Sequence, residues 1–279
     1  ERAKRRRRNL KRRLIAYGTI VGLIVGFYYY QPQRYHFFAD KPPKPNPRID
    51  PDSAKLFSKG VKIALIQAHP DDSEYFLAPL LLRLKASGAE IHQLVMTDGD
   101  KSFYFWKKED AAENRRVREA EQMEAASHYA ADVTFLHKPD GRLEYQGDNA
   151  DQVHAYLEKV QPDYVLCFDP TYWGKVNHAD HLASGRAAVN ALRSPGGVPS
   201  VKWVLFFSTV GTNFTPDVSN TIDQGIEMLA IHKSQFNGER LERIKDGRLD
   251  AYYNAGEAAN VGYGVALRAV PIEKLTAKG

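Results

Sequence analysis

Cysteine is almost absent from this sequence. The 279 residues include a single cysteine, Cys167, so no intramolecular disulfide can form, and neither a cysteine zinc cluster nor an iron–sulfur centre can be built. The chain is otherwise 43% hydrophobic and 26% charged, a composition typical of globular proteins. We therefore expect Cys167 to be a buried apolar residue.

The sequence also lacks an excess of positive charge beyond its first residues. The net charge is +5, but residues 1–13 hold nine Lys and Arg and one acid, which leaves 30 basic and 33 acidic residues after them. A nucleic-acid-binding domain would instead carry its cations on the folded domain. The basicity therefore belongs to an N-terminal tail, and we expect no nucleic-acid partner.

Long apolar runs are scarce as well, with one exception. Residues 14–30 carry no charge, and as a helix they would extend roughly 25 Å, near the lower limit for a membrane span. Arg12 and Arg13 precede the run and Tyr28–Tyr30 end it, as basic and aromatic anchors do at membrane interfaces. A cleaved signal peptide would need small residues at this end. Residues 14–30 are therefore predicted to be a single transmembrane helix.

The charges flanking this helix predict its orientation and its surroundings. Residues 31–48 hold four Lys and Arg against nine in residues 1–13, so the positive-inside bias places the basic tail in the cytoplasm. We expect a single-pass membrane protein, with everything after residue 30 on the periplasmic or extracellular side. Gly18, Gly22 and Gly26 share one helical face, a spacing that allows two such helices to form a dimer.

The chain after the predicted anchor divides into a linker and one domain. Residues 31–53 contain six prolines, which excludes a helix or a central strand and favours an extended spacer. Residues 54–279 show no internal repeat and no second change of composition. We therefore expect a single globular domain over 54–279.

The pattern of this domain favours an α/β fold. Short apolar runs alternate with longer segments of helical period, which is typical of βα units and a mostly parallel, Rossmann-like sheet flanked by helices. The predicted strands are Val61–Gln67, Ile91–Thr97, Val133–Leu136, Tyr164–Phe168 and Val201–Ser208. The predicted helices are Leu77–Ala86, Asp110–Ala130, Ala150–Val160, His181–Leu192, Ile222–His232 and Glu239–Ile244. Ligands bind beyond the carboxyl ends of such strands, so polar residues there are candidates for a site.

Two polar clusters follow predicted strands. Residues 68–74, AHPDDSE, follow the first strand and residues 169–181, ending in HADH, follow the fourth. Taken alone, the first could be a polar turn in which Asp72 or Ser73 caps the next helix, and the second could be a pair of surface histidines. Together they supply the imidazole and carboxylate ligands of a metal site, with acids left over for catalysis.

These residues resemble the PIG-L/LmbE-like family of zinc-dependent N-acetylglucosamine deacetylases. The motifs that carry the resemblance are AHPDD at 68–72, TDGD at 97–100, RRVREAEQMEAA at 115–126, KPDG at 138–141, HADH at 178–181 and, more weakly, HKSQ at 232–235. They span most of the globular domain and leave out the predicted anchor and linker.

The resemblance implies a role for each residue of the two clusters. The zinc ligands would be His69, Asp72 and His181, a set that leaves zinc positions open for water and substrate as in catalytic sites. The general base would be Asp71. The oxyanion of the tetrahedral intermediate would be stabilised by His178, with Asp180 orienting that imidazole.

Substrate contacts are predicted less directly. In the family an arginine of the Arg/Glu-rich helix contacts the sugar, and of Arg115, Arg116 and Arg118 we favour Arg116, with surface ion pairs as the alternative for all three. Further substrate-binding candidates are Asp98, Asp100 and Trp173. The sequence departs from the family at Ser73, where the family has an acid, and carries an acid one place later at Glu74.

The function expected from these observations is hydrolysis of the acetamide of an N-acetylated amino sugar by a membrane-anchored zinc enzyme. Two alternatives stay open. An Fe(II) oxygenase would use the same two histidines and one carboxylate, but it leaves Asp71 and His178 without a role. A tethered glycan-binding or assembly protein without turnover would agree with the Ser73 departure.

Overall fold

The structure, a computed structural model, describes residues 55–101, 110–171 and 178–277. The predicted cytoplasmic tail, transmembrane helix and proline-rich linker lie outside these residues, and so does Trp173. None of the helices within the described ranges has the length and apolar character needed to cross a membrane.

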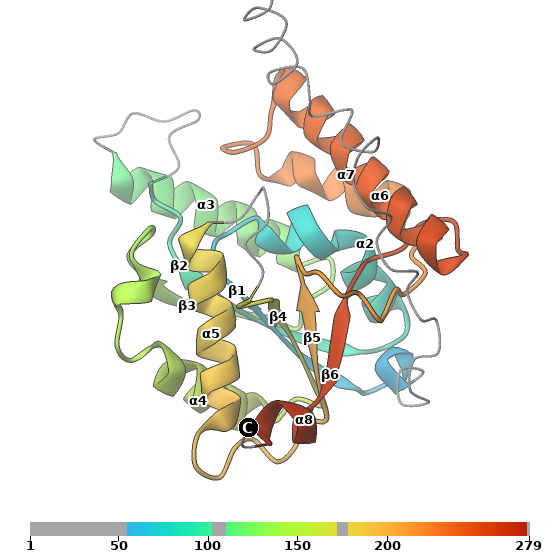
Figure 1. Cartoon of the computed structure of the whole chain (residues 1–279). Helices are drawn as coiled ribbons and strands as arrows, with labels where there is room; N and C mark the ends of the chain where they lie inside the picture. The colour runs from blue at the N-terminus through green and yellow to red at the C-terminus, as the bar shows by residue number, and fades with distance from the viewer. Residues whose placement is uncertain (1–54, 102–109, 172–177, 278–279) are drawn as a thin grey trace, which may run out of the picture. The chain divides into compact units, whose positions relative to one another are not determined.

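A six-stranded sheet forms the centre of the domain, in the order β3-β2-β1-β4-β5-β6 (Figure 1). The first five strands pair in parallel, and β6 pairs antiparallel with β5 at the edge. The strands are β1 (Lys62–Gln67), β2 (Glu90–Thr97), β3 (Asp132–Lys138), β4 (Tyr164–Phe168), β5 (Trp203–Phe207) and β6 (Arg268–Pro271). This confirms the predicted mixed α/β fold with a mostly parallel sheet.

The prediction missed β6. This strand has four residues, one of them Pro271, and proline is tolerated only at strand ends or sheet edges. So short a segment has no alternation that the sequence could display.

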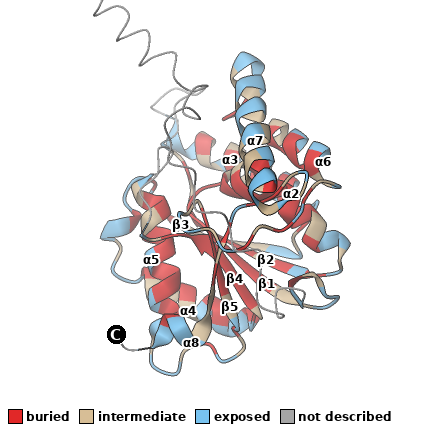
Figure 2. Ribbon diagram, turned by 45° about the vertical axis from the view of Figure 1, so that its right-hand side comes forward, coloured by how far each residue is buried: buried red, intermediate tan, exposed pale blue. Residues whose placement is uncertain are grey.

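Helices cover both faces of the sheet. One layer holds α2 (Asp72–Ala86), α3 (Ala111–Ala126), α6 (Ile222–Glu227) and α7 (Gly238–Ala259), and the other holds α4 (Asn149–Val160), α5 (Ala179–Arg193) and α8 (Ile272–Thr276) (Figure 1). Successive side chains of β1 pack against opposite helix layers, with Leu65 in one core and Ile66 in the other. This two-sided burial makes the central strands continuously apolar (Figure 2).

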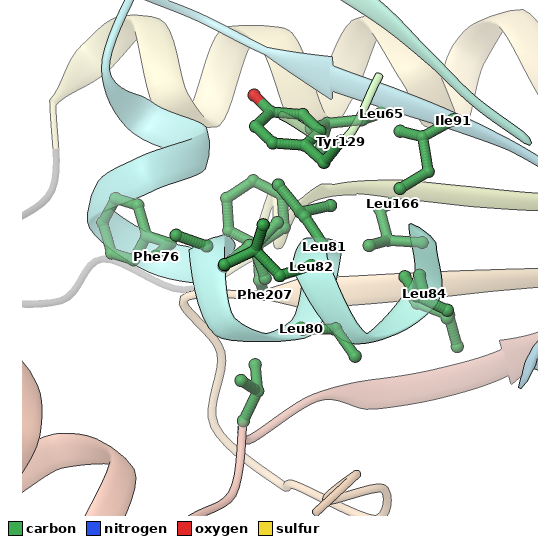
Figure 3. Packing of buried hydrophobic residues seen from close by; sticks show 14 of the residues in the cluster. Leu65, Phe76, Leu80, Leu81, Leu82, Leu84, Ile91, Tyr129, Leu166 and Phe207 are labelled. Carbon is green, nitrogen blue, oxygen red and sulfur yellow. The ribbon is translucent and has the colours of Figure 1, made fainter. Parts of the chain in front are cut away.

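The core under α2 is built from leucines and aromatic rings. Figure 3 shows Leu80 and Leu81 of α2 beside Leu65 and Leu166 of the sheet. Full burial of each such side chain contributes about 1.5–3 kcal/mol. Cys167 lies in the opposite core and is fully buried, which confirms the expectation for the single cysteine.

Two helices, α3 and α6, end before their predicted ends, at Ala126 and Glu227, and two others are markedly longer than predicted. Helix α2 begins at Asp72, five residues before Leu77, because its first turn is made of the polar residues that the apolar period does not include. Helix α7 continues to Ala259 instead of ending at Ile244. Only Tyr252 and Gly256 of α7 are buried, so its amphipathic signal is weak over most of its length.

The topology brings the two polar clusters together. Strands β1 and β4 are neighbours in the sheet, while the chain leaves β1 toward β2 and leaves β4 toward β5. Their carboxyl ends therefore form the switch point of the sheet, where open α/β folds bind ligands. The first cluster follows β1 and the second follows β4.

Candidate active site

The turn after β1 is closed by Asp72. One carboxylate oxygen, Oδ2, accepts the backbone N–H groups of Ala68 at 3.1 Å and His69 at 2.8 Å. The residue before it, Asp71, is the N-cap of α2 and has φ 99° without a side-chain capping bond. A non-glycine residue in such a left-handed conformation costs about 1–3 kcal/mol, so surrounding groups must hold it there.

The segment after β4 enters α5 through His178. This residue is the N-cap of α5, and its Nδ1 accepts the backbone N–H of Asp180 at 3.2 Å. With Nδ1 as the acceptor, the ring proton of a neutral imidazole lies on Nε2. Asp180 therefore contacts His178 through its backbone N–H.

The carboxylate of Asp180 is hydrogen-bonded to the turn after β3. Its oxygens accept the N–H of Gly141 at 2.6 Å and of Leu143 at 3.0 Å. It lies 3.4 Å from His69 Nε2 and 3.9 Å from His178 Nδ1. Asp180 therefore ties the KPDG turn to the start of α5 and to His69.

The three predicted metal ligands lie together. Nε2 of His181 is 3.0 Å from Asp72 Oδ1, and Nδ1 of His69 is 3.6 Å from Asp72 Oδ2. All three side chains are buried and offer one ligand atom each within 4.8 Å of one another. The ring of Phe168, the last residue of β4, stacks on His181 with centroids 4.1 Å apart, which fixes the plane of this imidazole.

A second group of side chains also has metal-ligand spacing. It comprises His69, Asp140, His178 and Asp180. Both oxygens of Asp180 are already occupied by backbone N–H groups, and Asp140 accepts the N–H of Lys101 at 3.1 Å. Asp72 Oδ1 faces the imidazole of His181 as Asp140 Oδ1 faces that of His69, so the second group differs by the occupied oxygens of Asp180 and the occupied Nδ1 of His178. Two imidazoles and one carboxylate are the donor set of catalytic zinc sites, so His69, Asp72 and His181 fit a metal better than the second group does.

The electrostatics of the site reflect many buried carboxylates around two imidazoles. Burial by itself lowers the pKa of His69, but hydrogen bonds with Asp140, Asp180 and Asp72 outweigh it and place the pKa well above its ordinary value. Burial raises the pKa of Asp72, and His181 and His69 reverse this and lower it. The negative charge concentrated here is suited to binding a cation.

Asp71 and His178 have shifted proton affinities of their own. Burial raises the pKa of Asp71 despite the opposing charge of Arg118, and burial together with the charge of His69 lowers the pKa of His178. A carboxylate with a raised pKa is a stronger base, and a histidine with a lowered pKa stays neutral near pH 7.

A cavity of about 370 Å³ opens over these groups. Its lining includes His69, Asp71, Asp72, His178 and His181. The remaining lining residues are Tyr75, Phe76, Lys101, Arg118, Asp140, Gly141, Gln235, Phe236 and Arg240. The structure therefore brings the predicted base, the predicted oxyanion donor and the three predicted ligands into one pocket.

The arginine at this cavity is Arg118, and the expectation for Arg116 is corrected. Arg116 is exposed and pairs with Glu113 at 2.6 Å, because its position on α3 faces solvent. Arg118 is buried and donates to Asp71 Oδ2 at 3.0 Å, to the carbonyl of Gly99 at 2.6 Å and to the carbonyl of Pro70. Gly99 has φ +62°, and a Cβ there would lie 2.4 Å from the guanidinium, so glycine is required at this approach.

Two other predicted substrate contacts, Asp98 and Asp100, are not among the described residues that line the cavity. Asp98 pairs with His137 at 2.6 Å and with Arg115 at 3.3 Å. Asp100 contributes its backbone carbonyl to Asn114 and is not part of the cavity lining. Both acids therefore make contacts around the turn after β2. Trp173 lies outside the described residues.

Several lining residues were not predicted from the sequence. Asp140 stands in the KPDG motif two residues after β3, so its position after a strand was a signal that could have identified it. Gln235 and Phe236 reach the cavity because Glu121 on α3 accepts both the N–H and the hydroxyl of Ser234, at 2.8 and 2.6 Å. No local pattern announces that contact.

The Ser73 departure has a structural counterpart. Both Ser73 and Glu74 are fully buried and turned away from the cavity lining. Glu74 accepts from Ser73 at 2.9 Å and from Tyr129 at 2.7 Å, and it pairs with His232 at 2.8 Å. The shifted acid therefore belongs to a closed polar network behind the site.

Comparison with known proteins identifies relatives with this architecture. Residues 64–192 match the profile of the PIG-L family, described as GlcNAc-PI de-N-acetylase. The diacetylchitobiose deacetylase of Thermococcus kodakarensis is 26% identical over 196 residues, which are 64% of this chain and 72% of that protein.

Solved structures share the fold. The N,N'-diacetylchitobiose deacetylase from Pyrococcus horikoshii superposes with a TM-score of 0.69 at 22% identity, over 76% of this chain and 84% of that chain. A 4-carboxy-2-hydroxymuconate hydratase from Pseudomonas putida superposes with a TM-score of 0.63 at 18% identity, over 76% and 96%. The fold alone therefore does not decide the reaction. Residues 64–192 therefore resemble the PIG-L family, and the chain is similar in sequence to a deacetylase, a hydrolase that acts on an amide.

Proposed function

We propose that the protein is a membrane-anchored, zinc-dependent deacetylase that removes the acetyl group from an N-acetylglucosamine-containing glycan or glycolipid. The observation that carries the proposal is the convergence of His69, Asp72 and His181 with Asp71 and His178 in one cavity. These residues come from two segments about 100 positions apart that meet at the switch point of the sheet.

Zinc is the metal that we propose for this donor set, because a hydrolytic reaction gives a role to Asp71 and His178, which line the same cavity. The residues that would hold it are His69, Asp72 and His181, since two imidazoles and one carboxylate leave room for water and a substrate oxygen. When bound, zinc supplies Lewis acidity that lowers the pKa of water and polarises the acetamide carbonyl.

Asp71 is placed to act as the general base. Its carboxylate lines the cavity next to the ligand Asp72 but is not itself one of the three ligands. Arg118 holds the Asp71 Oδ2 oxygen at 3.0 Å, so the other oxygen is left to accept the proton of the attacking water. Positioned bases of this kind contribute roughly 10²–10⁴-fold to rate.

His178 is placed to stabilise the developing negative charge. Its Nδ1 is occupied by the N–H of Asp180, so Nε2 carries the proton and is the donor available to an oxyanion. The ring lies beside His69, with centroids 4.7 Å apart. With a metal held by His69, Asp72 and His181, the Nε2–H of His178 would be available to the carbonyl oxygen of a bound acetamide.

The proposed location follows from residues 1–53, which lie outside the described residues. The uncharged run 14–30 between a basic tail and three tyrosines supports a single span with a cytoplasmic N-terminus. The catalytic domain would then meet lipid-linked, surface or cell-wall glycans on the non-cytoplasmic side. Protease added to cells from which any outer membrane has been removed should degrade the domain over 54–279, whereas resistance until the cytoplasmic membrane is lysed would reverse the proposed orientation.

The substrate class is tested by acetate release. The zinc-loaded chain is incubated with free, oligomeric and lipid-linked N-acetylglucosamine, and acetate is measured with and without chelator. The proposal predicts chelator-sensitive acetate release from at least one of these substrates. Stoichiometric zinc without acetate release from any of the three would support a glycan-binding protein instead, and a site that retains iron in preference to zinc would support an oxygenase.

A further inference from the structure

The backbone of Asp71 is held in place by a side chain that does not touch the cavity. Its φ of 99° is a left-handed conformation that a non-glycine residue keeps only when the surroundings fix it. The backbone N–H of Asp71 donates to Gln122 Oε1 at 2.8 Å. Gln122 lies on α3, is fully buried and is not part of the cavity lining.

Asp71 is therefore fixed from two directions. On the cavity side, Arg118 donates to the carboxylate of Asp71 and to the carbonyl of Pro70. On the far side, Gln122 accepts the Asp71 N–H. Arg118 and Gln122 lie one helical turn apart on α3. The same helix therefore binds both the carboxylate and the backbone N–H of Asp71, the proposed base.

The amide of Gln122 has a defined orientation. Its Oε1 accepts from Asp71 and, at 3.2 Å, from Gln67 Nε2. The other end, Nε2, faces oxygen atoms only: Ser73 Oγ at 3.3 Å, Glu74 Oε2 at 3.4 Å, Tyr129 Oη at 3.4 Å and Gln93 Oε1 at 3.5 Å. Reversing the amide would place an oxygen among these oxygens and an N–H against the Asp71 N–H.

The network behind Gln122 includes the residues at which this chain departs from the family pattern. Ser73 donates to Glu74, and Glu74 is closed off by Tyr129 and His232. Gln93 joins the network by donating to Ser73 Oγ at 2.9 Å. The acid displaced from 73 to 74 therefore contributes to orienting the amide that holds Asp71.

We propose that Gln122 is a positioning residue for the reaction, acting through the backbone of Asp71. The inference rests on the proposed function, since it assigns Asp71 the role of base. Without the acceptor at 122, the left-handed peptide loses its partner and the carboxylate turns away from the attacking water. Binding of metal and substrate stays intact, because none of the three ligands contacts Gln122.

The test uses the whole chain with Gln122→Met, which keeps the volume and removes the acceptor. We expect kcat to fall roughly 10–50-fold with KM within about 2-fold and zinc content unchanged, since misplacing a catalytic group acts on kcat. In an Asp71→Asn background, the same substitution should change kcat less than about 2-fold, because the base through which it acts is already lost.

Two further variants separate positioning from a general loss of stability. Thr221→Val removes a hydroxyl that donates to the carbonyl of Pro79 on α2 at 2.7 Å, outside this network, and it should leave kcat within about 2-fold while lowering the melting temperature. Gln122→Glu, protonated in this buried place, keeps a carbonyl oxygen that can accept the backbone N–H of Asp71. Its kcat should therefore be much closer to that of the wild type than the kcat of Gln122→Met. If Gln122→Met does not fold, Gln122→Thr, which is too short to reach the Asp71 N–H, takes its place.

The outcomes decide the inference in either direction. It is overturned if Gln122→Met keeps wild-type kcat, or if Gln122→Met lowers kcat as strongly in the Asp71→Asn background as in the wild type. Absence of acetate release by the wild type would count against the proposed function only. In that case a crystal structure of Gln122→Met decides, because φ of Asp71 should leave the left-handed region, and an unchanged φ would overturn the inference.

Discussion

The first turn of α2 separates two buried polar clusters of opposite character. Asp71 and Asp72 face the cavity among imidazoles and further carboxylates, while Ser73 and Glu74 face a closed network of amides, a phenol and one histidine. On the cavity side, one oxygen each of Asp72 and Asp140 lies against an imidazole, at 3.0 and 3.2 Å, where a bound cation could take its place. Behind it, the single acid finds hydrogen-bond donors on all sides.

This difference separates a site that binds a ligand from a site that holds structure. Carboxylates gathered without enough donors remain stable only with a cation or a solvent-filled cavity. A carboxylate surrounded by donors is satisfied and rigid, and it can fix its neighbours. In the first turn of α2, Asp71 and Asp72 therefore face the proposed reaction, whereas Ser73 and Glu74 help to hold these residues in position.

The largest expected effect is on the metal side. His181→Ala removes one of two imidazole ligands, and we expect bound zinc to fall to near zero and acetate release to fall more than about 10⁴-fold. Metal analysis of the purified variant, beside the acetate assay, measures both. His92→Ala, which removes a histidine paired with Asp132 outside the cavity, is the control and should keep metal and activity.

Asp71→Asn tests whether the base is distinct from the ligands. We expect kcat to fall roughly 10²–10⁴-fold with zinc bound as in the wild type, because the variant loses proton acceptance and keeps all three ligands. Asp98→Asn is the matched control, since Asp98 pairs with His137 away from the cavity. Loss of zinc in Asp71→Asn would contradict the assignment and make Asp71 a ligand.

On the far side, His232→Gln should affect stability more than chemistry. Removing the partner of buried Glu74 is expected to cost about 3–5 kcal/mol of unfolding free energy near pH 6. Burial lowers the pKa of His232, but the hydrogen bond and charge of Glu74 outweigh it and raise the pKa above its ordinary value. The folded state therefore holds this proton more tightly than the unfolded chain does.

The sign of the pH dependence follows from that raised pKa. The contribution of His232 is fully present below the unfolded value of about 6.5 and is lost as pH rises through the folded pKa. Urea unfolding of wild type and His232→Gln at pH 6 and pH 9 should show a difference that shrinks at the higher pH. A constant difference would mean that the pKa of His232 is the same in the folded and unfolded states, and a difference that grows with pH would mean that the folded state holds this histidine neutral.

The smallest effect is expected for the arginine outside both clusters. Arg116→Ala breaks an exposed pair with Glu113 that solvent screens, and it should leave kcat and KM within about 2-fold. Arg118→Ala, in contrast, removes the buried guanidinium that holds Asp71 and should lower kcat. Equal losses in the two variants would mean that the exposed arginine also reaches the substrate.

Much of the fold could be predicted because its central strands have simple patterns. The strand Tyr164–Phe168 was predicted at its observed bounds, and β1, β2 and β5 within two residues at each end, since buried parallel strands are uninterrupted apolar runs. The antiparallel edge strand β6 and most of α7 were missed. Both lack a strong apolar period, because tertiary contacts at a few positions fix them instead of a continuous buried face.

The site could be predicted where its residues follow a strand and not where a distant element supplies them. The groups at 69–72 and 178–181 stand beyond β1 and β4, so the rule for parallel sheets located them. The choice between Arg116 and Arg118 depends on the rotation of α3 about its axis, which a short, highly charged helix does not reveal. Gln122 and His232 gain their roles only through contacts across the fold.

The measurement that tests the central claim most directly is metal content together with acetate release before and after chelation. The account predicts that the chain binds one equivalent of zinc, loses acetate release from an N-acetylglucosamine substrate when zinc is removed, and regains it when zinc is returned. Undiminished acetate release by the metal-free protein would contradict the account, and so would activity restored by iron but not by zinc.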